Sequence, residues 1–388
     1  MKRYGCCFVI EALLRPLSIS RFERPYRTRS RSSRTGERGK PCDRQGVLFK
    51  RGATAAQPAV ETHAGPAYTP SVPVALRLIL VLAVAALFAA TALSFVMAYL
   101  LLRPPRMSDG KALWLLKRLS PEDLGLSFEN VEFRVQDEGG GRPLRLAGWW
   151  IPHPHAQSRC VVLVHGYADA KVGVIAWAPV FHSLGCNIFA IDMRAHGESG
   201  GTISTAGFYE WYDLDQVINE LRAQRPGETK RLTLFGVSTG AAIVSAVATR
   251  RDDLAGIILD SPFADFRHAA MAHFDLLGLP GRPVQRLALR LAERMSGADF
   301  GAISPRATLG AVRCPVMLIQ CEADPFTDTQ DQAALRAVVD GRSNELDVYW
   351  RVEGCAHLMA VCADEEQYRQ RVGDFLASTT VAATEVRS

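Results

Sequence analysis

The residues with the clearest chemical potential lie between Arg231 and Ser245. Apolar, β-prone residues lead into the segment 236–240, which reads Gly-Val-Ser-Thr-Gly, and small residues that suit a helix follow it. This is the G-x-S-x-G pattern between a predicted strand and a predicted helix. A chain that turns sharply from strand to helix has no room for side chains beside its apex residue, which explains the glycines. We therefore expect Ser238 to be an exposed nucleophile, with the Thr239 N–H beginning a helix that stabilises a developing oxyanion.

The serine hydroxyl needs a general base and a carboxylate that orients the base. Three histidines follow Ser238 in the chain, namely His268, His273 and His357. The first two fall on a predicted helix of an insertion, whereas His357 lies in a loop directly after the last predicted strand. Because the carboxyl ends of parallel strands share one edge of a sheet, this loop should lie beside the serine. His357 is therefore the expected base.

The expected acid is Asp324, which follows the penultimate predicted strand. Its loop should lie beside the loop that carries His357. Asp260, at the end of the strand before the insertion, is the main alternative, and Glu322 and Asp328 are weaker ones. If Asp324 is the acid, Asp260 becomes a structural carboxylate or an anchor for the insertion.

A second backbone donor for the oxyanion is expected near the end of the first parallel strand. The Tyr167 N–H, which follows a His-Gly pair, is the candidate, and it would act together with the N–H of Thr239. His165 itself is expected to be structural. His196 belongs to the segment 192–199, which precedes the serine, and we expect it to brace a loop by hydrogen bonds rather than to act as the base.

Strands and helices alternate through the region that carries these residues. Two segments of alternating hydrophobicity predict an antiparallel opening pair, and the later strands are continuous apolar runs, which indicates a parallel sheet covered by helices on both faces. The expected strands are 131–135, 144–151, 160–167, 186–192, 231–237, 255–260, 315–320 and 345–352. The expected helices are 109–119, 171–184, 209–222, the helix after Ser238 as far as 251, 328–339 and 364–377.

An insertion separates two of these strands, between Asp260 and Cys314. It contains two helical stretches, 263–277 and 284–295, of which the second is strongly amphipathic. An insertion above the carboxyl edge of the sheet is predicted to cap the pocket. Its apolar residues either line an acyl-binding site or only pack the cap onto the domain.

Residues 78–102 are 25 consecutive positions without a charge, between Arg77 and Arg103. The run exceeds the roughly 20 residues that cross membrane hydrocarbon, and it is too long for the core of an ordinary signal peptide. It predicts a single transmembrane helix. The basic residues give conflicting indications of its orientation: the distant arm would place the N-terminus inside, whereas the nearest positive charges follow the helix, at 103–118.

The 388-residue chain divides by charge and composition. Residues 1–77 hold 15 Lys and Arg against 5 Asp and Glu, are rich in Ser, Gly and Pro, and are expected to form a disordered basic arm. No pattern in the arm predicts specific nucleic-acid binding. Residues 103–388 hold 30 Lys and Arg against 35 Asp and Glu. We expect a connecting linker at 103–128, the catalytic domain at 129–380 with its cap at about 263–305, and a tail at 381–388.

The nine cysteines do not decide the compartment, and no Cys/His spacing is typical of a zinc site. Cys321 and Cys355 are expected in loops that converge near the active site, so an oxidising surrounding would allow a disulfide between them. Acyl transfer by an activated serine needs no cofactor and no metal, and none is expected.

Together these residues resemble the α/β-hydrolase superfamily, and more narrowly its prolyl-oligopeptidase-like and ABHD-type serine hydrolases, a group that includes membrane-anchored members. The resemblance implies Ser238 as nucleophile, Asp324 as acid and His357 as base. At Gln320-Cys321 the chain departs from relatives, which commonly show His-Gly before the acid loop. The matching motifs are His165-Gly166, Asp192-x-Arg194-x-His196-Gly197-x-Ser199, Tyr209-Glu210-x-x-Asp213-Leu214, Gly236-x-Ser238-x-Gly240, Ser261-Pro262-Phe263-x-Asp265, Asp324 and His357.

The sequence therefore predicts a membrane-anchored serine hydrolase that cleaves acyl esters or thioesters, with a small-molecule or lipid-like acyl substrate and an acyl-enzyme intermediate. A serine peptidase or amidase of the same fold is the closest alternative. Epoxide and haloalkane hydrolases of this fold use a carboxylate nucleophile, so Ser238 argues against both. From another class, the domain would be a catalytically inactive binding module at the membrane, and the complete set of three candidate residues weighs against that.

Overall fold

The computed structural model describes residues 73–156, 158–279 and 281–385. The described residues from 86 onward form one compact unit, and those before them begin a long apolar helix, α2 (Val74–Leu101). The basic arm predicted for residues 1–77 lies outside the described residues except for its last five. The helix predicted to begin at residue 78 begins four residues earlier, because the Pro73 carbonyl accepts the N–H groups of Leu76 and Arg77 at 2.9 and 3.1 Å.

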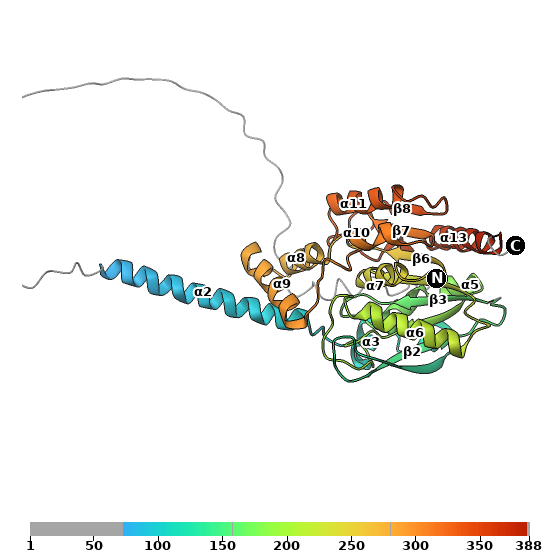
Figure 1. The fold of residues 1–388 in the computed structure, drawn as a ribbon, viewed down its shortest axis with the longest axis horizontal. Helices are drawn as coiled ribbons and strands as arrows, with labels where there is room; N and C mark the ends of the chain where they lie inside the picture. Colours follow the sequence, from blue (N-terminus) through green and yellow to red (C-terminus); the bar gives the residue numbers. More distant parts are fainter. Residues whose placement is uncertain (1–72, 157, 280, 386–388) are drawn as a thin grey trace, which may run out of the picture. The chain divides into compact units, whose positions relative to one another are not determined.

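One sheet of eight strands forms the core of the compact unit (Figure 1). β2 pairs antiparallel with both β1 and β4, and every other neighbouring pair is parallel. The order across the sheet is β1-β2-β4-β3-β5-β6-β7-β8, which confirms the predicted mostly parallel architecture. The strands are β1 (Glu129–Val135), β2 (Leu144–Ile151), β3 (Arg159–Val164), β4 (Asn187–Ile191), β5 (Arg231–Val237), β6 (Leu254–Asp260), β7 (Val316–Cys321) and β8 (Val348–Val352).

Helices cover both faces of this sheet. The parallel strands are therefore buried on both sides. The core on one face contains side chains from α3 (Asp109–Leu116), α4 (Lys171–Val174), α5 (Ala178–Ser183), α12 (Ala360–Ala363) and α13 (Glu365–Glu385). The core on the other face contains side chains from α6 (Glu210–Gln224), α7 (Thr239–Ala248) and α11 (Thr329–Asp340).

Three expectations about helices are corrected. The single helix predicted for 171–184 is interrupted by the 3-10 turn η4 (Ile175–Trp177). α5 begins at Ala178 with Pro179 in its first turn, and Pro179 has no N–H to donate to the preceding turn. The helix predicted for 364–377 begins at Glu365 and continues to Glu385 as α13, through alanines that favour helix. The linker 103–128 contains α3, which ends at Leu116 rather than at 119, and the 3-10 turn η3 (Pro121–Leu124).

The insertion after β6 forms two helices, α8 (Phe266–Leu276) and α9 (Arg282–Ser296). They are followed by α10 (Pro305–Thr308) and the 3-10 turn η5 (Leu309–Ala311). The Asp265 side chain caps α8 by accepting the Arg267 N–H at 2.7 Å, and Pro283 lies in the first turn of α9. The buried sides of both helices join a third apolar cluster, which also contains Met97, Ala98 and Leu101 of α2.

Candidate active site

The end of β5 and the start of α7 form a sharp turn at Ser238. Ser238 has φ 53° and ψ −117°, a backbone conformation that residues other than glycine rarely adopt. A Cβ on Gly236 would overlap the carbonyl group of Gly240, and a Cβ on Gly240 would overlap the carbonyl oxygen of Val164 in β3. Both glycines are therefore required for this approach of strand and helix. The Ser238 N–H donates to the carbonyl of Asp260 at 3.0 Å, which ties the turn to β6.

The backbone N–H groups of Tyr167 and Thr239 lie beside this turn, and neither has a recorded acceptor within the described part of the chain. Thr239 is the first residue of α7, so its N–H has no partner inside the helix. Gly166, which precedes Tyr167, approaches the serine so closely that a Cβ there would lie 3.3 Å from Ser238 Cβ. Tyr167 and Thr239 also line one small cavity. The two residues predicted to supply the oxyanion donors thus line the same cavity beside the Ser238 turn.

Asp324 and His357 are hydrogen-bonded to each other in the loops that follow β7 and β8. His357 Nδ1 lies 2.6 Å from Asp324 Oδ2, and the two side chains are only 8% and 2% exposed. Asp324 Oδ1 accepts the N–H of Phe326 at 2.9 Å, and the Phe326 ring packs edge-on against the imidazole. Because the ring donates through Nδ1 to the carboxylate, its Nε2 is left as the acceptor that a general base requires.

Backbone contacts bring the serine turn and the His357 loop to the same edge of the sheet. Asp260 accepts the Ser238 N–H, and the next residue, Ser261, accepts the Leu358 N–H through Oγ at 3.1 Å. Leu358 directly follows His357. No hydrogen bond between Ser238 Oγ and His357 Nε2 is recorded among the described residues, and such bonds often tighten only when substrate binds.

Asp260, the alternative acid, is fully buried and bonded to other partners. Its Oδ2 accepts from the Tyr368 hydroxyl at 2.8 Å and its Oδ1 from Ser261 Oγ at 2.9 Å. Burial raises the pKa of this carboxyl, against the effect of these donors. In the described chain it is Asp324, and not Asp260, that hydrogen-bonds to His357. Tyr368 lies in α13, 108 residues further on, and no local sequence pattern identified it.

His165 and His196 are hydrogen-bonded within the loops around the serine. The Nε2 atom of His165 accepts the Met193 N–H at 3.0 Å, and the Nε2 atom of His196 accepts the Ala168 N–H at 3.2 Å. Each ring donates from Nδ1 to a nearby carbonyl, at 2.7 and 2.9 Å. A ring that both donates and accepts is neutral, and burial lowers the pKa of both imidazoles accordingly.

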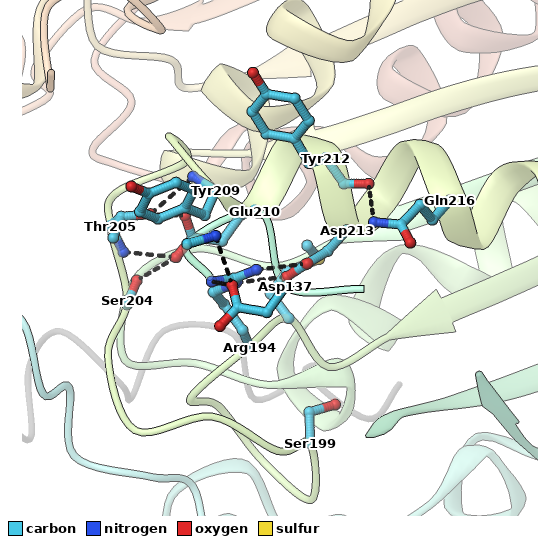
Figure 2. A network of polar contacts seen from close by, with 12 residues as sticks. Asp137, Arg194, Ser199, Ser204, Thr205, Tyr209, Glu210, Tyr212, Asp213 and Gln216 are labelled. Atoms are coloured by element: carbon cyan, nitrogen blue, oxygen red, sulfur yellow. Dashed lines mark hydrogen bonds and ion pairs between the residues drawn. The ribbon is translucent and has the colours of Figure 1, made fainter. Parts of the chain in front are cut away.

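A buried polar network braces the loop after β4 against the start of α6 (Figure 2). Arg194 donates to both carboxylate oxygens of Asp213, at 2.6 and 2.7 Å, and to Asp137 at 2.9 Å. Burial raises the pKa of Asp213 to about 6, although Arg194 opposes the shift. Glu210 accepts four hydrogen bonds at 2.6–2.9 Å, from groups of Ser204, Thr205 and Gly207. Apart from the shared motif, no sequence feature predicted this role of Glu210.

Cys321 and Cys355 come together beside the Asp324–His357 pair. Their sulfur atoms lie 2.7 Å apart, and both residues are buried free thiols. The hydrogen bond with Cys355, and then burial, raises the pKa of the Cys321 thiol. Across the described ranges, no group of three or more His, Cys, Asp or Glu residues is arranged to hold a metal ion.

Comparisons with known proteins match this geometry. Residues 155–299 match a family model described as serine aminopeptidase, S33. The uncharacterised protein YqkD of Bacillus subtilis is 26% identical over 260 residues, which cover 66% of this chain and 82% of YqkD. The uncharacterised membrane protein YNL320W of Saccharomyces cerevisiae is 25% identical over 159 residues, which cover 41% of this chain and 54% of the yeast protein.

Among solved structures, the Pyrococcus furiosus esterase Pf2001 is similar, with a TM-score of 0.57 and 22% identity. The alignment covers 71% of this chain and 98% of the esterase. At this identity the likeness establishes a common fold. The strand order, the turn at Ser238 and the family match agree with it. The chain has the α/β-hydrolase fold.

Proposed function

We propose that this protein is a membrane-anchored serine hydrolase that cleaves acyl esters or thioesters, with Ser238 as nucleophile, His357 as base and Asp324 as acid. The observation that supports this most directly is the buried 2.6 Å contact between Asp324 and His357 at the sheet edge where the strained Ser238 turn lies. A carboxylate in this position fixes the imidazole tautomer and orients Nε2 to take a proton.

In the proposed reaction, His357 Nε2 removes the hydroxyl proton of Ser238 while Oγ attacks the acyl carbonyl carbon. The N–H groups of Tyr167 and Thr239 stabilise the negative charge that develops on the carbonyl oxygen, and the start of α7 adds its helix dipole. His357 then gives its proton to the leaving alcohol or thiol. A water molecule, deprotonated by the same nitrogen, releases the acid from the acyl-enzyme. Asp324 stabilises the imidazolium in both steps.

Acyl esters or thioesters are the preferred substrate class because the cap is rich in apolar side chains. Met271 and Leu279 are partly buried against its apolar cluster. Such a surface suits an acyl chain better than a charged amine. A peptidase or amidase is the second candidate, and the description of the matched family, serine aminopeptidase, favours it.

The anchor is the helix α2. It has 28 residues, its most apolar window has a mean hydropathy of 2.6, and only 6% of that window is buried. A core helix of a soluble protein would be buried, so the exposed apolar surface favours insertion in a bilayer. The yeast relative is described as a membrane protein, which is in line with this proposal.

The test is a panel of water-soluble p-nitrophenyl esters of increasing acyl length beside aminoacyl p-nitroanilides, assayed with the full chain in detergent micelles. We expect kcat/KM to be highest for an ester and to rise with acyl length. Ser238→Ala should lower kcat by at least about a thousandfold. Higher kcat/KM for aminoacyl amides than for esters would indicate a peptidase. Full ester turnover by Ser238→Ala would reject Ser238 as the nucleophile.

A further inference from the structure

The cap helix α9 has a row of arginines, Arg282, Arg286, Arg290 and Arg294, spaced four residues apart. All four are exposed. Arg282 pairs with Asp275 at 2.9 Å, whereas the described residues provide no recorded ion pair or hydrogen bond to the side chains of the other three. Residues four apart lie on neighbouring positions of one helix surface. Three cations are therefore held together on the cap with no partner of opposite charge.

A second surface of α9 is apolar and only partly covered. Val284, Leu287, Leu291 and Met295 follow one another at spacings of three and four residues, and Met295 is 38% exposed. Leu276 and Leu277, at the end of α8, are 40% and 37% exposed. Outside α2, the described chain exposes six large apolar side chains to this extent, and these three lie in the cap. Helices that lie flat on a membrane combine such apolar and basic surfaces.

The remaining, buried surface of α9 belongs to the same apolar cluster as the end of α2. Ser94 Oγ of α2 donates to the Val284 carbonyl at 3.1 Å, and the cluster contains Ala288, Leu289 and Ala292 together with Met97, Ala98 and Leu101. At the same level of α2, Tyr99 is 45% exposed and its ring lies 4.0 Å from the Arg103 guanidinium. A tyrosine and an arginine at the end of an apolar helix are typical of a membrane–water interface.

From these contacts we propose that α9 lies on the surface of the membrane that α2 enters, with Arg286, Arg290 and Arg294 on the phosphates of anionic phospholipids. The apolar side chains of Leu291 and Met295 contact the upper acyl chains. The inference rests on the proposed anchor, because α9 reaches the surface only through α2. Each basic residue near an anionic surface adds roughly a fivefold preference, so three favour the docked state about a hundredfold.

The inference is tested with the full chain in nanodiscs, made either of phosphatidylcholine or of equal parts phosphatidylcholine and phosphatidylglycerol. Amide hydrogen exchange of residues 282–296 is measured in both. A triple variant replaces Arg286, Arg290 and Arg294 by Gln. A matched control replaces Arg313, Arg336 and Arg369, which are also exposed but lie outside the cap. Turnover of a water-soluble ester in the same samples reports folding and catalysis independently.

We expect α9 of the wild type and of the control variant to exchange more slowly in anionic than in zwitterionic discs, by up to about a hundredfold, and high salt to remove the difference. In the cap variant the two discs should give equal rates, with unchanged ester turnover. Equal rates for the wild type in both discs would overturn the inference while leaving the anchor intact. If the wild type did not co-elute with discs at all, the anchor itself would be wrong and the inference would fall with it.

Discussion

At the scale of single residues, two buried aspartates differ in their hydrogen-bond partners. Asp324 is bonded to His357 Nδ1, and Asp260 to Tyr368 and Ser261. Asp260 ends β6 and Asp324 follows β7, so their positions in the sequence favoured Asp324 but left Asp260 as an alternative. Their hydrogen bonds separate them, because only a carboxylate in contact with the imidazole can orient the base.

Asp324→Asn is therefore expected to lower kcat for a soluble ester by up to about ten-thousandfold, since an amide cannot stabilise the imidazolium and favours the wrong tautomer. Asp260→Asn should leave kcat within about tenfold and mainly lower the melting temperature, because the amide oxygen still accepts a hydrogen bond from Tyr368. The measurement is steady-state kinetics of both variants beside thermal unfolding. The opposite ranking of the two kcat losses would exchange the roles of the aspartates.

The neutral His165 makes stability depend on pH. Burial, and then the neighbouring His196, lowers the His165 pKa well below its ordinary value. Below about pH 6.5 the unfolded chain binds a proton that the folded chain does not, so this group costs roughly 1.4 kcal/mol of stability per pH unit as the pH falls. Above about pH 6.5 both states are neutral and the cost is absent.

His165→Asn keeps a side-chain amide near the Gly166 carbonyl and removes the titration. We expect the destabilisation caused by this variant to be smaller at pH 5.5 than at pH 7, by about 1 kcal/mol. The measurement is urea unfolding of both proteins in detergent at the two pH values. Buried aspartates such as Asp213, whose raised pKa acts in the opposite direction, are common to both proteins and cancel in the difference. A destabilisation independent of pH would contradict the neutral state assigned to His165.

At the scale of elements, the site depends on how closely α7 approaches β3 and β5. Gly236 and Gly240 have no space for a Cβ, and this close contact holds the Ser238 turn at its strained φ. The contact between α7 and the strands therefore sets the position of the Ser238 turn, and the loops after β7 and β8 lie at the same edge of the sheet.

Gly240→Ala is expected to destabilise the protein by about 3 kcal/mol, because the added methyl group would overlap the backbone of β3. Gly110→Ala is the matched control: it lies in α3 with open space around it, and alanine there should be neutral or stabilise by up to about 1 kcal/mol. The measurement is thermal unfolding of the two variants beside the wild type. Equal stability of the Gly240 variant and the wild type would mean that α7 does not approach β3 in this way.

The sequence predicted those parts of the structure that depend on local pattern. The continuous apolar runs identified the parallel strands, and the G-x-S-x-G pattern identified the serine turn, because both follow from neighbouring residues. The partners of Asp260 and Glu210 could not be predicted, since Tyr368 is 108 residues from Asp260 and the donors to Glu210 come from an irregular loop. The helix break before Pro179 could have been predicted, because a proline inside a helical pattern indicates a break. The predicted helix 171–184 nevertheless continued through it.

At the scale of the whole molecule, the chain joins an α/β-hydrolase fold to one long apolar helix. α2 is exposed along most of its length, and its last turns pack against the cap through Met97, Ala98 and Leu101. An anchor of this kind would keep the serine close to substrates that partition into a bilayer.

We expect the full chain to remain in the membrane pellet after an alkaline carbonate wash. Replacing both Leu87 and Phe88 by Arg places two charges near the middle of α2, at a cost of about 3 kcal/mol each for insertion, and should release the protein. Leu113→Arg, at an exposed apolar position outside α2, should stay in the pellet. Release of the wild type by the wash would contradict the transmembrane assignment.

Whether Ser238 is an activated nucleophile is measured by reaction of the full chain with a fluorophosphonate, followed by mass-spectrometric mapping of the adduct. We expect one adduct, on Ser238, that is absent in Ser238→Ala and forms far more slowly in His357→Ala. An adduct on another residue, or an unreactive wild type that is correctly folded, would contradict this expectation.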